Sequence, residues 1–136
     1  MYTGYWKLSE RPFVNSNRPD FLYYSRKHEE AMVRMLYGIG ESKGISLLVG
    51  DPGTGKTFLS HLLRRNLIDR GFAVALIAQP NLGPDDLISS IAEGFGLPVN
   101  GSGKGHLLHE IERFTLARRA AGTECALILD NACGIT

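Results

Sequence analysis

Residues 45–57 read Ile-Ser-Leu-Leu-Val-Gly-Asp-Pro-Gly-Thr-Gly-Lys-Thr, an apolar run that ends in a glycine-rich turn. From position 50 the turn has the spacing G-x-x-x-x-G-K-[ST]. Glycines allow the backbone to curl so that successive N–H groups point inward at a phosphate, and a helix that starts here presents its positive end to the same anion. We therefore predict a phosphate-binding P-loop (Walker A) made of Gly50, Asp51, Pro52, Gly53, Thr54, Gly55, Lys56 and Thr57.

The residues on both sides of this loop fit the prediction. The run from Ile45 to Val49 is short, apolar and branched, which predicts a fully buried strand. Apolar residues recur at helical spacing over 57–68, which predicts a helix. The alternative is a glycine-rich turn that only connects a strand to a helix. We expect nucleotide binding, with Lys56 on the β- and γ-phosphates of ATP and the Thr57 hydroxyl on Mg²⁺.

Composition and charge narrow the class of protein. The 136 residues suit one domain with one core, and a hydrophobic content of 43% is ordinary for a soluble globular protein. The formal net charge of +1 does not indicate a nucleic-acid-binding protein, although a local basic patch could still bind nucleic acid. No apolar run has the length of a membrane span. Cys125 and Cys133 do not make a disulfide framework, so we expect a reduced, cytoplasmic compartment.

Two regions follow from the remaining pattern. Residues 1–24 are irregular and rich in aromatic side chains, and we expect them to lie as a strap over an α/β core of residues 25–136. These aromatics either pack against the core or place one ring on a nucleotide base. The rest of the core is predicted to hold helices over 25–37, from Pro84 onward and over 106–120, and buried strands over 72–78 and 125–129. This order predicts a parallel sheet with helices on both faces.

Asp130 directly follows the last predicted strand. A carboxylate at the end of a buried parallel strand is costly unless it serves a cation. We therefore predict that Asp130 holds Mg²⁺ together with Thr57, the Walker B role. The alternative is a turn in which Asp130 and Asn131 only end the strand.

With these motifs placed, the chain is similar to AAA+ ATPases of the ExeA-like group, the general (type II) secretion pathway protein A family. The resemblance covers nearly the whole chain and includes, besides the P-loop and the Asp130 strand, Arg11-Pro12-Phe13, residues 21–25, residues 28–31, residues 36–39, Gln79-Pro80 and residues 95–98.

This resemblance implies a P-loop NTPase sandwich of three layers that uses ATP and Mg²⁺ and assembles as a homo-oligomer. In the family, ATP hydrolysis is coupled to the assembly of secretion or envelope machinery, and in transposition relatives to events on DNA. Regions outside this chain would place such a protein at the inner membrane.

Two departures from the family pattern affect the expected activity. The family's Asp-Glu pair reads Asp130-Asn131 here, and an amide can hydrogen-bond the attacking water but cannot accept its proton. We therefore name Lys56, Asp130 and Asn131 as catalytic residues of a weak ATPase, and keep an ATP-gated binding module without turnover as the alternative. In the family, a further strand inserts between the P-loop strand and the Asp130 strand. Its absence from residues 1–136 predicts a truncated sheet with unpaired edges.

Overall fold

The computed structural model describes residues 2–5, 7, 9, 24–42, 44–78, 83–101 and 103–131. Within them lie helices α1 (Tyr2–Tyr5), α2 (Arg26–Gly40), α3 (Lys56–Asp69), α4 (Pro84–Gly94) and α5 (Lys104–Ala120), and strands β1 (Ala73–Ile77) and β2 (Cys125–Leu129). None of the described helices has the length and apolar character that crossing a bilayer requires.

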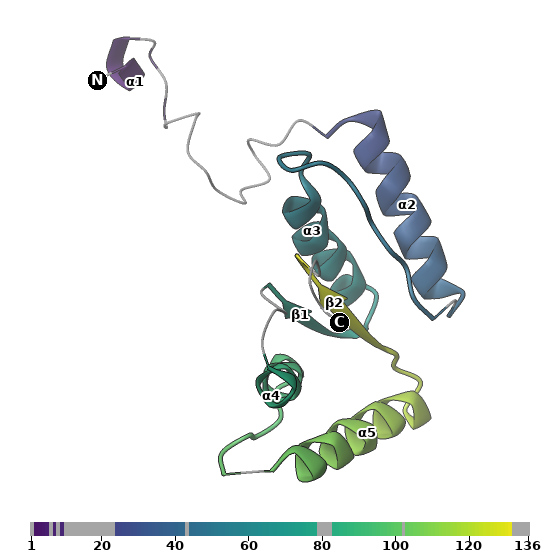
Figure 1. The fold of residues 1–136 in the computed structure, drawn as a ribbon. Coiled ribbons are helices and arrows are strands. Elements are labelled where there is room, and N and C mark those ends of the chain that lie inside the picture. The colour runs from purple at the N-terminus through teal and green to yellow at the C-terminus, as the bar shows by residue number, and fades with distance from the viewer. Residues whose placement is uncertain are drawn as a thin grey trace.

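The two strands form a parallel pair, and the helices cover both of its faces. The register runs from Ala73 opposite Cys125 to Ile77 opposite Leu129. The chain between the strands forms α4 and α5, the crossover that parallel pairing requires. Figure 1 shows α2 and α3 on one side of the sheet and α4 and α5 on the other. The predicted α/β architecture with three layers is confirmed.

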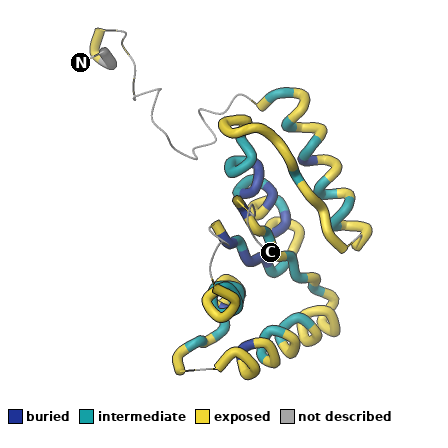
Figure 2. The backbone as a smooth tube through the Cα atoms, viewed as in Figure 1, coloured by how far each residue is buried: buried dark blue, intermediate teal, exposed yellow. Residues whose placement is uncertain are grey.

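The core lies between α2, α3 and β1. Along α3, Leu59, Leu63 and Leu67 recur every four residues and form one buried stripe. This stripe packs against Met32 of α2 and Val74 of β1. Figure 2 shows the buried residues concentrated on α3 and β1. The same packing fixes the direction of α3, and therefore the place where its first residue meets the loop at 50–55.

The prediction that Ile45–Val49 forms a fully buried strand is wrong. These residues adopt no strand, and Ile45, Leu47 and Val49 are 92%, 81% and 80% exposed. Figure 2 shows the exposed path of this segment toward the loop. A strand needs a neighbour that satisfies its N–H and C=O groups, and in the described sheet β1 and β2 pair only with each other. The apolar pattern indicates that these residues favour burial, but it does not show whether a neighbouring strand is present to pair with them.

The aromatic strap stays a prediction. Residues 10–23, which include Phe13 and Phe21, lie outside the described residues. Of the aromatic side chains that the structure does describe in this region, Tyr5 is 79% exposed and Tyr24 is 41% exposed. Tyr24 lies next to the N-terminus of α2, where its ring is stacked on that of His28 with centroids 6.2 Å apart.

Candidate phosphate-binding site

The loop before α3 is a closed glycine turn. The Thr54 N–H donates to the Asp51 carbonyl at 3.3 Å, and the Thr54 hydroxyl donates to the same oxygen at 2.7 Å. Gly53 and Gly55 have φ values of 80° and 96°, in the left-handed region that glycine adopts without strain. A Cβ at Gly50 would lie 3.0 Å from the Thr54 hydroxyl oxygen. The predicted glycines are therefore the residues that let this turn close.

Lys56 is the first residue of α3, and its side chain folds back over the turn. Its Nζ donates to the Gly50 carbonyl at 2.5 Å and to the Asp51 carbonyl at 2.7 Å. These neutral acceptors hold the ammonium group beside the loop. Because a phosphate carries a charge opposite to that of the ammonium group and the carbonyls carry none, a phosphate can displace the carbonyls as its partner. Lys56 thus lies where the motif requires a cation.

The N-terminus of α3 carries no side-chain cap. Gly55 occupies the N-cap position, and the first backbone bond of the helix is Leu59 N–H to the Gly55 carbonyl, 2.9 Å. The N–H groups of Lys56, Thr57 and Phe58 therefore precede the first intrahelical donor. Free N–H groups and the positive end of a fourteen-residue helix both favour an anion at this point.

Asp130 is buried at the end of the sheet, with 8% of the residue exposed. Its N–H continues the ladder to β1 by donating to the Ile77 carbonyl at 2.9 Å, and its Oδ1 accepts the Asn131 N–H at 3.0 Å. Within the described chain it makes no hydrogen bond to Lys56 or Thr57. The structure therefore places the predicted residues on two supports, the loop with α3 and the end of β2, without a hydrogen bond between Asp130 and either Lys56 or Thr57.

Asn131 is exposed and has a φ of 57°. Asparagine is one of the few residues other than glycine that visit this left-handed conformation routinely. Asparagine thus suits the backbone at this position.

The oxygen donors of the predicted site suit a magnesium ion that a nucleotide also binds. They do not form the kind of side-chain cluster that holds a metal ion without a nucleotide. Among the described residues, no three His, Cys, Asp or Glu side chains gather into a metal-binding cluster. Mg²⁺ binds through one or two protein oxygens together with water and the phosphates of a nucleotide. Thr57, whose hydroxyl makes no hydrogen bond within the described chain, and Asp130 are donors of this kind. Their chemistry suits Mg²⁺ bound with a nucleotide.

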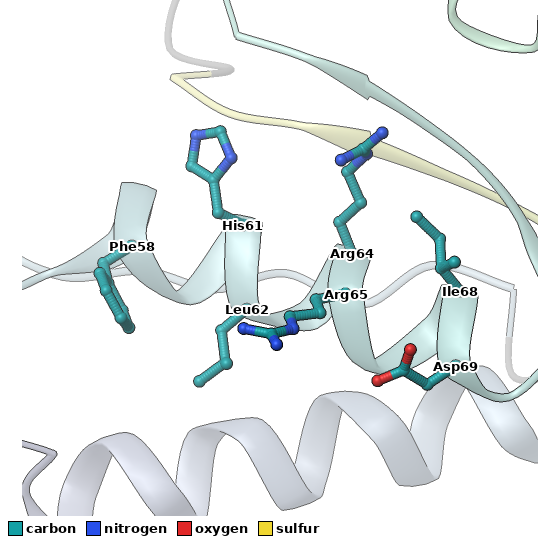
Figure 3. Close-up of a pocket in the computed structure, with 7 residues that line it drawn as sticks. All are labelled: Phe58, His61, Leu62, Arg64, Arg65, Ile68 and Asp69. Carbon is teal, nitrogen blue, oxygen red and sulfur yellow. The ribbon is translucent and has the colours of Figure 1, made fainter. Parts of the chain in front are cut away.

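An open pocket of about 300 Å³ on the surface of α3 is a separate feature. Figure 3 shows side chains on both sides of the helix around it. Its lining residues are Phe58, His61, Leu62, Arg64, Arg65, Ile68 and Asp69. All of them follow Thr57 in the chain, and none belongs to the loop. We therefore do not assign this pocket to the nucleotide.

The sequence pattern gave no functional role to His28, which contacts the loop directly. His28 Nε2 lies 2.6 Å from the Thr54 carbonyl oxygen, across twenty-six positions of sequence. The neighbouring Tyr24 is partly buried, and this burial, together with the Glu29 carboxylate, raises the pKa of its phenol. A local signal existed in Ser25-x-x-His28, which has the spacing of a capping box with histidine in place of glutamate.

Comparisons with known proteins agree with this geometry. A family model described as "AAA domain" matches residues 39–133. The chain is 38% identical over 133 residues to the "General secretion pathway protein A" of Aeromonas hydrophila. That match covers 97% of this chain and 24% of the relative, so the chain spans about a quarter of the relative's length. No solved structure matches the chain. The resemblance to the ExeA-like ATPases is confirmed.

Proposed function

Because the chain belongs to the AAA domain family, we propose that its loop at 50–57 binds ATP as the Mg²⁺ complex. The observation that supports this most strongly is the junction of loop and helix. Lys56 Nζ lies within hydrogen-bonding distance of the carbonyls of Gly50 and Asp51, beside a helix end that has no cap. A cation and several free N–H groups thus converge on one small volume, which is the arrangement that a polyphosphate requires.

Each residue has a distinct part in the proposal. Lys56 leaves its carbonyl acceptors and donates to the β- and γ-phosphates. The amides of the loop and of the first helical turn donate to the remaining phosphate oxygens. Thr57 and Asp130 hold the metal ion, Asp130 from a position that its backbone bond to Ile77 keeps fixed. Bound Mg²⁺ neutralises phosphate charge.

A series of adenine nucleotides that differ in the number of phosphates tests whether the phosphates are the recognised group. We expect ATP and ADP to bind with similar affinity and AMP to bind at least about 100-fold more weakly, because AMP lacks the acceptors for Lys56 and the loop amides. Displacement of a fluorescent ATP analogue from the chain measures all three, with adenosine as the control without phosphate. Equal competition by AMP and ATP would show that recognition rests on the base and would refute the proposal.

The proposed function has two forms, a weak ATPase and an ATP-gated binding module, and they differ in whether bound ATP is hydrolysed. In a weak ATPase, Asn131 orients the attacking water by hydrogen bonding, whereas in an ATP-gated binding module the nucleotide stays intact. The left-handed backbone at Asn131 suits asparagine irrespective of catalysis, so this backbone does not by itself distinguish the two forms. We propose ATP binding with slow hydrolysis, and substitution of Asn131 tests whether this residue limits the rate.

For the whole protein, we propose a homo-oligomer, located in the cytoplasm or at the inner membrane, in which ATP binding and hydrolysis drive the assembly of secretion or envelope machinery. The name of the Aeromonas hydrophila relative supports this assignment. A role in DNA transposition is the second candidate, and the net charge of +1 does not favour it. We expect deletion of the gene to lower the amount of secreted protein in the medium, with rescue by the intact gene. Unchanged secretion would contradict the assignment.

A further inference from the structure

His28 joins the N-terminus of α2 to the loop before α3. The helix begins after Ser25, whose hydroxyl accepts the His28 N–H at 3.2 Å. The imidazole then bridges two segments. Its Nδ1 lies 3.2 Å from the Ser25 nitrogen and 2.9 Å from the Ser25 hydroxyl, while its Nε2 lies 2.6 Å from the Thr54 carbonyl oxygen. Helix capping requires only the bonds to Ser25, so the bond to Thr54 calls for a second explanation.

These partners define one protonation state of the ring. A carbonyl oxygen can only accept, so Nε2 must carry a hydrogen to bond Thr54. The Ser25 backbone N–H can only donate, so Nδ1 must be free to accept it. Both conditions hold together only in the neutral ring protonated on Nε2. Ser25 therefore selects the form of His28 that donates to the loop.

The bond to Thr54 also sets the direction of the next amide. The peptide between Thr54 and Gly55 is trans, so its C=O and N–H point in opposite directions. With the carbonyl directed at His28, the Gly55 N–H points away from that ring. The contact itself depends on glycine, because a Cβ at Gly55 would lie 3.2 Å from His28 Nε2, and the φ of 96° there also favours glycine.

We propose that His28 is a positioning residue for the P-loop. Held by Ser25 in the neutral form protonated on Nε2, it fixes the Thr54 carbonyl outward and presents the Gly55 N–H to the phosphates. This inference rests on the proposed nucleotide function. In this role His28 raises the affinity for nucleotide without contacting it. The N-terminus of α2 then helps to hold the phosphate-binding loop in place.

Three substitutions separate this role from helix capping. His28→Leu removes both the acceptor for the Ser25 N–H and the donor to Thr54, whereas glutamine fits the capping box and also carries a terminal N–H that can reach the Thr54 carbonyl. Ser25→Ala weakens the cap but keeps the imidazole, and we expect it to bind ADP and ATP within about twofold of the wild type. We expect His28→Leu to weaken binding of ADP and ATP by about five- to tenfold, and His28→Gln to restore affinity to within about threefold of the wild type. Equal affinities in the two His28 variants would overturn the proposal. Urea unfolding of both variants shows whether they lose the same stability.

A measurement without nucleotide keeps the two proposals distinguishable. Nitrogen NMR of the isotope-labelled chain reports which ring nitrogen of His28 carries the hydrogen. We expect protonation on Nε2 and a free Nδ1, and a shift of the Thr54 carbonyl resonance in His28→Leu. A ring protonated on Nδ1 would overturn the positioning role whether or not nucleotide binds. If the wild type binds no nucleotide while the ring has the expected form, the proposed function fails and the inferred effect on affinity fails with it, but the bond to Thr54 stands.

Discussion

We expect Lys56→Met to weaken binding of Mg·ATP by roughly 30- to 100-fold and to leave the fold in place. A hydrogen bond to a charged group contributes about 2–3 kcal/mol, and about 1.4 kcal/mol corresponds to a tenfold change in affinity. Among the described residues the ammonium group bonds only the carbonyls of Gly50 and Asp51, which belong to an exposed loop. Its loss therefore costs little stability. Calorimetric titration with Mg·ATP measures the affinity, and thermal unfolding checks the fold.

Lys104→Met is the matched control for this substitution. Lys104 is likewise the first residue of a helix and follows a glycine. That glycine has an extended backbone with φ −76°, in contrast to the left-handed Gly55, and Lys104 is exposed. We expect the control variant to bind Mg·ATP within about twofold of the wild type, a difference below about 0.5 kcal/mol. A similar loss in both variants would mean that general charge, and not the P-loop, attracts the nucleotide.

We expect Asn131→Glu to raise the rate of ATP hydrolysis by at least about tenfold. A positioned general base contributes about 10²- to 10⁴-fold, and part of this is lost when the base is not ideally placed. Glutamate can accept a proton from the attacking water, whereas the amide of Asn131 cannot. The backbone opposes the change, because a φ of 57° costs a residue other than glycine, asparagine or aspartate about 1 kcal/mol or more.

Asn131→Gln distinguishes the effect of a general base from the effect of backbone strain at position 131. Glutamine has the length of glutamate and meets the same left-handed backbone, but it carries no base. Phosphate release at saturating Mg·ATP measures both variants, and we expect the gain in Asn131→Glu alone. Equal rates in the two variants would show that a general base at position 131 does not limit hydrolysis. Parts of the site other than residue 131 would then limit turnover, whereas a large gain in Asn131→Glu would support the ATP-gated binding module that Asn131 leaves inactive.

Local patterns predicted the parts of the fold that depend on neighbouring residues. The motif at 50–57 and the leucine stripe after it predicted a helix over 57–68, and α3 spans Lys56–Asp69. The strand predicted over 125–129 has the observed bounds, but the prediction that it is buried is wrong, since Leu127 and Leu129 are 43% and 36% exposed. Pro84 after Gly83 starts α4, because proline fits the first position of a helix. In each case the residues that specify the element lie within it or beside it.

What the sequence did not predict depends on residues distant in the chain. Burial of Ile45–Val49 requires a neighbouring strand, and no property of these five residues shows whether one is present. His28 is another such case. Its spacing from Ser25 indicates a helix start, but the contact with Thr54 arises only because α2 packs against α3. The metal-binding role of Asp130 was predicted from its place after a strand; the structure shows that the residue is buried, and the role stays a prediction.

The most direct test of the central claim is the backbone amide spectrum of the chain during titration with Mg·ATP. If the glycine turn and the start of α3 bind the phosphates, the amide resonances of residues 50–57 change most, with Gly55 and Lys56 among the largest, and they saturate together. Asp130 at the end of β2 changes with them through the metal ion. Saturable changes confined to other elements, or no change at millimolar nucleotide, would contradict the account.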